Sequence, residues 1–192
     1  MNALTEGLLF LIQSFFDIYI FLMMLRVILQ WVHADSRNPL VQFVSKITNP
    51  PLLFTRKFLS FYRGIDLGAI AVLLLLELVK FSLIILLTSG GFPHVGGLIV
   101  LAFAELLQQM ISIFLYSIFI FVILSWFAPV INAAFIQVLF QITEPLMRPA
   151  RRIIHPIAGL DFSPVIVLIF LKLIQIVITQ PLMRIAYVMA AN

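Results

Sequence analysis

Four long apolar stretches set the limits on what this chain can fold into. They cover roughly Leu8 to Val32, Leu67 to Thr88, Leu98 to Ala128 and Pro164 to Tyr187. Each reaches the length of about 20 residues that a helix needs to cross the hydrocarbon of a bilayer. Only 10% of the residues are charged, against about 25% in soluble domains. The stretches lack the alternation of a membrane barrel, so we predict an all-α integral membrane protein with four transmembrane helices.

The basic residues indicate how these spans are oriented. Five lie between the first two spans and three between the last two: Arg37, Lys46, Arg56, Lys57, Arg63, Arg148, Arg151 and Arg152. The middle connection, Ser89 to Gly97, contains no lysine or arginine. Because Lys and Arg are enriched in cytoplasmic loops, we expect both basic segments in the cytoplasm and both termini on the opposite side of the membrane.

The chain also contains an internal repeat. A shift of 95 residues aligns Leu8–Lys80 with Phe103–Gln175 without a gap, and eighteen of the 73 aligned positions are identical. The matching residues of other types lie mostly outside the spans, where a shared apolar bias cannot produce them: Trp31 with Trp126, Thr48 with Thr143, Pro50 with Pro145, Arg56 with Arg151, Gly64 with Gly159 and Asp66 with Asp161. Each unit reads span, basic segment, span, so the copies have the same orientation. We assign residues 1–97 and 98–192 to the two repeats.

Each basic segment begins with a short amphipathic pattern. Asn38 and Pro39 occupy the positions of an N-cap and a first helical residue, an apolar stripe follows, and Pro50 and Pro51 are expected to end the helix. The second repeat has an equivalent stripe after Ala133. We expect both helices to lie in the cytoplasmic membrane interface. Five basic residues at their ends would set topology and meet anionic lipid headgroups, or dock a protein partner: Arg56, Lys57, Arg148, Arg151 and Arg152.

Polar residues just before the second span of each unit are candidate helix caps. Asp66 precedes one span, and Asp161 and Ser163 precede the other. Short side chains with an oxygen acceptor bind the free N–H groups of a first helical turn. With Asn38, these residues are expected to fix where helices begin.

Charged residues inside the apolar stretches are the main candidates for a functional site. Each is costly in lipid unless it finds a partner or water, and they are Asp17, Arg26, Glu77, Lys80, Glu105 and Lys172. Glu77 and Lys80 have the spacing of a pair on one helix face. Glu77 also aligns with Lys172 across the repeat, so these two could meet on facing helices, whereas Arg26 could reach the headgroups. Two interpretations stay open: an ion or proton path, and ion pairs that fix packing.

The sequence gives little indication of catalysis or of cofactor binding. The chain has no cysteine, and its three histidines lie in connections rather than facing one another within the membrane, as an embedded haem would require. No catalytic triad, HExxH or phosphate-binding glycine motif is present. We therefore expect no enzymatic activity, cofactor, metal or nucleic acid.

The two units resemble the YggT family of small bacterial membrane proteins, also called YlmG. In the first unit the resemblance rests on Arg26-Val27 through Trp31, Asn38-Pro39, Thr48-x-Pro50 and Arg56-Lys57. In the second it rests on Thr143-Glu144-Pro145-Leu146, Pro149, Arg151-Arg152, Asp161 and Ser163-Pro164. The first unit departs from the pattern at Phe54, where the second has Pro149. The resemblance covers nearly the whole chain as two tandem copies.

This resemblance implies a bacterial inner-membrane location, with periplasmic termini, and a link to osmotic tolerance and potassium uptake. Relatives of the family are associated with division genes, and in plastids with cytochrome b6 haem attachment or nucleoid organisation. One hypothesis is therefore ion or osmotic homeostasis, through a small polar path or as an accessory to an uptake system. The alternative is a scaffold or assembly factor that docks a membrane protein. A homodimer would help to bury the polar faces.

Overall fold

The computed structural model describes residues 3–59, 61–62, 65–89, 91, 94–125, 133–154 and 161–191. Four helical segments in this part of the chain are long and apolar enough to cross a membrane: Ala3–Trp31, Leu67–Thr88, Val95–Ser125 and Ser163–Ala190. They match the four predicted spans, so the chain is a multi-pass membrane protein. Several residues used in the sequence analysis lie outside the described ranges: Arg63, Gly64, Trp126, Gly159 and one of the three histidines, His155.

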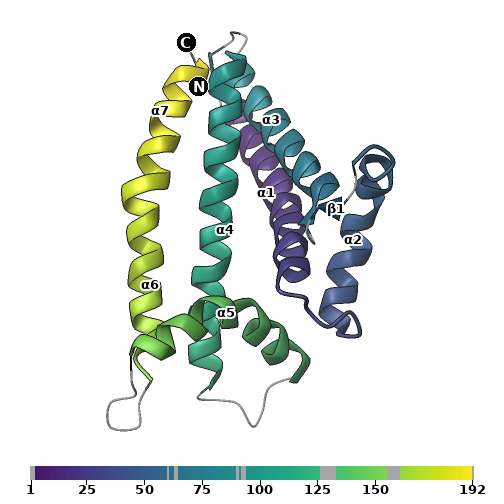
Figure 1. Cartoon of the computed structure of the whole chain (residues 1–192). Helices are drawn as coiled ribbons and strands as arrows, with labels where there is room; N and C mark the ends of the chain where they lie inside the picture. Colours follow the sequence, from purple (N-terminus) through teal and green to yellow (C-terminus); the bar gives the residue numbers. More distant parts are fainter. Residues whose placement is uncertain are drawn as a thin grey trace.

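The spans are the helices α1 (Ala3–Trp31), α3 (Leu67–Ser89) and α4 (Val95–Ser125), followed by a column built of three segments. That column consists of α6 (Ser163–Ile174), one π-helical turn, η2 (Gln175–Thr179), and α7 (Gln180–Ala191). Both termini lie at one end of the bundle (Figure 1). α3 ends and α4 begins at this same end, because the two helices follow one another in a hairpin.

The amphipathic helices are α2 (Pro39–Thr55) and α5 (Ala133–Ile153). Each packs against both spans of its own repeat: α2 against α1 and α3, and α5 against α4 and α6. In Figure 1, α5 lies across the lower ends of α4 and α6, whereas α2 is inclined along α1 and α3. The two helices also contact one another, which joins the repeats at the end opposite the termini.

Both amphipathic helices continue through their prolines, so the prediction that Pro50 and Pro51 end the first one was wrong. A proline inside a helix costs about 3 kcal/mol, because it removes a hydrogen bond and crowds the preceding turn. Burial of the next turn offsets that cost: Leu52 and Met147, just beyond the prolines, are 0% and 1% exposed. The segment TEPLMRPARRI is therefore helical rather than a linker.

A short antiparallel ladder follows α2. Strands β1 (Phe61–Tyr62) and β2 (Ile65–Asp66) pair in the register Phe61 with Asp66 and Tyr62 with Ile65. The sequence analysis did not predict it. The ladder turns the chain back so that Asp66 lies directly at the start of α3, near the end of α2.

The spans have apolar outer faces, and the interior of the bundle holds an apolar core together with several buried polar side chains. Large apolar side chains on the outer faces of the spans are exposed in the bare protein, where lipid would cover them, for example Phe10, Phe15, Phe103 and Phe170. The polar side chains Glu77, Thr48, Thr143 and Thr179 are among the most deeply buried. Since lipid is as apolar as leucine, close packing and polar contacts rather than the hydrophobic effect hold such helices together.

Candidate functional site

The ammonium group of Lys80 is the centre of a polar cluster within the spans. Its Nζ lies 2.7 Å from Oε2 of Glu77 on the same helix and 3.0 Å from Oδ1 of Asp17 on α1. It also lies 4.7 Å from the centre of the Phe81 ring. Glu77 and Lys80 are buried, whereas the Asp17 side chain is 57% exposed. The expected pairing of Glu77 with Lys80 is thus present, and it reaches a second span.

A third carboxylate faces this cluster from α4. Glu105 is half-buried and lies within electrostatic range of Lys80 and Asp17. The buried Oε1 of Glu77 has no hydrogen-bond partner among the described residues. Three acidic side chains on three spans therefore surround one lysine. They do not converge as metal ligands do, since the described residues contain no group of three that could hold a metal ion.

In the second repeat, the corresponding contact between the spans is made by a network of neutral side chains. Ser112 and Gln175, which align with Asp17 and Lys80, are joined by a hydrogen bond of 2.9 Å from Nε2 to Oγ. Lys172, which aligns with Glu77, donates to Oε1 of Gln175 at 3.3 Å. Among the described residues no ion pair joins Lys172 to Glu77, so the structure does not bring these two charges together. Lys172 is exposed on the outer face.

The π-helical turn η2 positions part of this neutral network. Gln175 and Thr179 begin and end the turn, and both are buried. The hydroxyl of Thr179 donates to Oε1 of Gln108 on α4, and Gln175 reaches Ser112 on the same helix. Such π-turns are rare and frequent at functional sites. Sequence reasoning missed Ser112, Gln175 and Thr179 because they are uncharged, although alignment with Asp17 and Lys80 marks the first two.

An arginine–aspartate pair closes the corner between the amphipathic helix and the next span in each repeat. Arg56 Nη2 lies 2.6 Å from Oδ2 of Asp66, and Arg151 Nε lies 3.0 Å from Oδ2 of Asp161. In both corners the other aspartate oxygen accepts a backbone N–H at the start of the span, from Ala69 and Ser163 respectively. The capping roles expected for Asp66 and Asp161 are therefore present, and each aspartate also fixes an arginine.

The two corners differ in their exposure to solvent. Asp66 is buried, whereas the Asp161 side chain is 39% exposed and Arg151 also meets Glu144 at 3.3 Å. Slight burial raises the pKa of Asp161, but the hydrogen bond from the Ser163 backbone N–H and the nearby Arg151 guanidinium outweigh it, so the pKa lies below its usual value. The Ser163 hydroxyl is buried with no partner among the described residues, so its side chain is not the cap.

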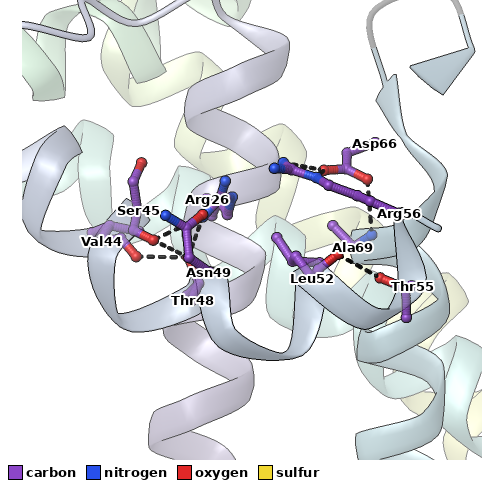
Figure 2. Close-up of polar contacts among 10 residues, drawn as sticks. All are labelled: Arg26, Val44, Ser45, Thr48, Asn49, Leu52, Thr55, Arg56, Asp66 and Ala69. Atoms are coloured by element: carbon purple, nitrogen blue, oxygen red, sulfur yellow. Dashed lines mark hydrogen bonds and ion pairs between the residues drawn. The ribbon is translucent and has the colours of Figure 1, made fainter. Parts of the chain in front are cut away.

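Arg26 binds the amphipathic helix through one nitrogen of its guanidinium group. Its Nη1 donates to the carbonyl of Ser45 and to the side chains of Thr48 and Asn49, at 2.8 to 2.9 Å (Figure 2). The aligned position in the second repeat is Phe121, whose ring packs 6.1 Å from that of Phe140. The first repeat thus uses a charge where the second uses aromatic packing.

Asn38 connects the two amphipathic helices. Its Oδ1 accepts the N–H of Leu40, which confirms the predicted cap, and its Nδ2 donates to the carbonyl of Ala134 at 2.8 Å. The remaining basic candidates, Lys57, Arg148 and Arg152, are exposed.

Comparison with known proteins agrees with this two-fold construction. The family model CCB3/YggT matches the chain twice, over residues 5–87 and 100–182. The chain belongs to the CCB3/YggT family. The two matches are offset by the same 95 residues as the repeat, so each unit of the chain is one copy of the family's module.

Bacterial members of the CCB3/YggT family match along almost the whole chain. An uncharacterized protein of Pseudomonas aeruginosa is 34% identical over 186 residues, covering 95% of this chain and 93% of the relative. Uncharacterized protein YggT of Escherichia coli K12 is 29% identical over 183 residues, covering 95% and 92%. A Vibrio alginolyticus protein described from the proC 3' region is 33% identical over 174 residues, covering 90% and 91%. No solved structure matches.

Proposed function

We propose that this chain supports potassium or osmotic homeostasis in a bacterial inner membrane, with its termini in the periplasm. The observation that carries the proposal is the cluster of Asp17, Glu77 and Glu105 around Lys80. With every group ionised, three carboxylates and one ammonium leave two negative charges inside the spans. Charge of that sign within a membrane favours cations, and ionisable groups at such depth usually mark a path or a relay.

The geometry suggests how a cation would enter the cluster. Asp17 is the exposed member and holds Lys80 at 3.0 Å, while Glu77 holds it from the buried side at 2.7 Å. A cation that approaches Asp17 competes with the Lys80 ammonium for the same carboxylate. Lys80 is part of the protein and so competes with the entering cation for Asp17. Glu105 supplies a further acidic group on α4.

Potassium flux tests the path directly. The purified protein in liposomes is expected to release trapped potassium faster than empty liposomes do, and Glu77→Gln or Glu105→Gln is expected to slow that release. Glu6→Gln, near the N-terminal end of α1 and away from the cluster, is the matched control. Flux equal to that of empty liposomes would exclude the path.

The accessory version of the proposal is tested in cells. A bacterium without its own copy is expected to grow poorly at limiting potassium or high osmolarity. The wild-type chain should rescue growth, and the Glu77→Gln chain should fail to do so although it reaches the membrane in equal amount. If the Glu77→Gln chain rescued growth as completely as the wild type, the cluster around Lys80 would have no role in the function.

The second candidate function is a scaffold for a membrane partner. It is favoured by the exposed basic side chains Lys57, Arg148 and Arg152, which lie close in the sequence to the two arginine–aspartate corners. Under this alternative, replacing these three residues with glutamine abolishes growth rescue, whereas Glu77→Gln leaves it intact. The two proposals therefore predict opposite results from the same growth assay.

A further inference from the structure

Two cavities lie next to each other where α1 meets α2 and the second repeat. The smaller has a volume of about 150 Å³ and four polar residues in its wall: Arg26, Gln30, Ser45 and Arg56. The larger has a volume of about 460 Å³ and lies between the two repeats. Its wall is mainly apolar and draws on both repeats, with Val27, Trp31, Ile70, Met110, Leu146 and Leu171 among its residues.

The cavities share part of their wall. Gln30 lines both of them, while Arg56 lines the smaller and Asp66, its ion-pair partner, lines the larger. In Figure 2 the guanidinium group of Arg56 extends from α2 toward α1, the helix that carries Arg26. A polar compartment and an apolar compartment are thus separated by one ion pair and one amide side chain.

The polar compartment carries a net positive charge. Asp66 balances the charge of Arg56 at 2.6 Å. The Arg26 side chain uses Nη1 for three neutral acceptors, and its Nε and Nη2 form no hydrogen bond with any described residue. The guanidinium of Arg26 therefore keeps donors and an unbalanced charge for an anion, and phosphate matches the geometry of guanidinium donors.

The apolar compartment suits a hydrocarbon chain. Its volume falls within the range of roughly 300–1,000 Å³ typical of ligand pockets. Apolar cavities do not take up water, and protein interiors rarely leave so much space unfilled. Trp31 lines this cavity and is half exposed, which opens one side of it toward the surroundings of α1.

We propose that one anionic phospholipid binds across these compartments, with its phosphate beside Arg26 and one acyl chain between the repeats. Such a lipid would fill the gap between the two modules and link them. The inference uses residues outside the cluster around Lys80 and holds whether or not that cluster conducts ions.

Native mass spectrometry of the full chain in detergent tests the proposal, with dioleoylphosphatidylglycerol, dioleoylphosphatidylcholine and inorganic phosphate as separate probes. We expect one phosphatidylglycerol per chain, bound at least about tenfold more tightly than phosphatidylcholine, because both lipids carry the phosphate but the choline ammonium of phosphatidylcholine is repelled by the positive charge of Arg26. Arg26→Gln should remove the preference. Arg148→Gln, an exposed arginine at the same end, should keep it.

Met110→Trp provides a second variant that leaves Arg26 and its contacts to α2 unchanged. It fills the apolar compartment and is expected to weaken phosphatidylglycerol binding at least about tenfold, so the proposal is testable even if Arg26→Gln does not fold. Equal binding of the two lipids, or unchanged binding by Met110→Trp, would overturn the proposal. Inorganic phosphate that displaces phosphatidylglycerol completely would identify a free-anion site and also overturn it.

Discussion

The Nζ of Lys80 lies 3.0 Å from Oδ1 of Asp17, and 95 residues further on Gln175 and Ser112 form the corresponding contact at 2.9 Å. The two repeats therefore join their first and second spans at the same place, once with charges and once without. Inside a membrane either solution satisfies the polar groups. The charges of the first repeat are therefore not required for the contact between its spans, which supports the proposal that they serve the function.

Lys80→Gln should destabilise the protein strongly, because it leaves Glu77 and Asp17 without their ammonium partner. Removing one member of a buried ion pair costs about 3–5 kcal/mol. The triple variant Asp17→Ser, Glu77→Gln, Lys80→Gln takes over the Ser112–Gln175 contact of the second repeat and leaves no charge at the buried position 77, so it should recover most of that loss. Thermal unfolding in detergent measures both. A triple variant no more stable than Lys80→Gln alone would show that the two networks are not interchangeable.

The four spans and the repeat could be predicted from the sequence because hydropathy and residue identity at fixed spacing are local properties. The caps at Asn38 and Asp66 were predictable for the same reason. The path of α2 and α5 through Pro50 and Pro145 was not, since burial of Leu52 and Met147 against the spans decides it. Tertiary packing here overrides a local rule that holds for isolated helices.

Side-chain partners were predicted only where they lie on one helix. The pairing of Glu77 with Lys80 follows from their spacing, whereas the contact of Lys80 with Asp17 depends on how α3 packs against α1. The contacts of Arg26 with α2 likewise require the chain to fold back on α1 after Trp31. No periodicity in the sequence encodes that reversal.

The corner of the first repeat should contribute more to stability than the corner of the second. Arg56→Gln leaves the carboxylate of Asp66 buried and without its ion pair, at a cost of several kcal/mol. Arg151→Gln affects an exposed pair, and such pairs contribute about 0–1 kcal/mol. Comparing the melting temperatures of the two variants, with Arg152→Gln as a control for charge, tests the difference. Equal effects would contradict it.

Acid should reduce the stability that Asp161 contributes at the corner of the second repeat. Folding lowers the pKa of Asp161 below the usual aspartate value near 3.8. The carboxylate therefore contributes its full share to the free energy of unfolding above that value, and this share is lost as the pH falls through the pKa of the folded state. The stability difference between wild type and Asp161→Asn should therefore shrink from pH 5 to about pH 3. The effect should be small, since the side chain is 39% exposed. A difference that grows on acidification would contradict the assignment.

Gly97 allows α4 to approach the C-terminal helix. A Cβ atom at this position would clash with the backbone of Met189 and Ala190, whereas at Gly96 it would meet only the movable ring of His94. Gly97→Ala should therefore cost roughly 1–3 kcal/mol through overpacking, and Gly96→Ala should have little effect. The melting temperatures of the two variants test this difference. Equal melting temperatures would show that α4 and α7 can move apart without cost.

Asn38 uses its two side-chain atoms for different purposes, and substitutions can separate them. Asn38→Asp keeps the acceptor for the Leu40 N–H but loses the donor to the Ala134 carbonyl, whereas Asn38→Ala loses both. The cap contributes about 1 kcal/mol, and the link between helices contributes a similar amount. We expect hydrogen exchange to rise at the start of α5 in both variants, but at the start of α2 only in Asn38→Ala. Unchanged exchange in α5 would mean that Asn38 does not couple the repeats.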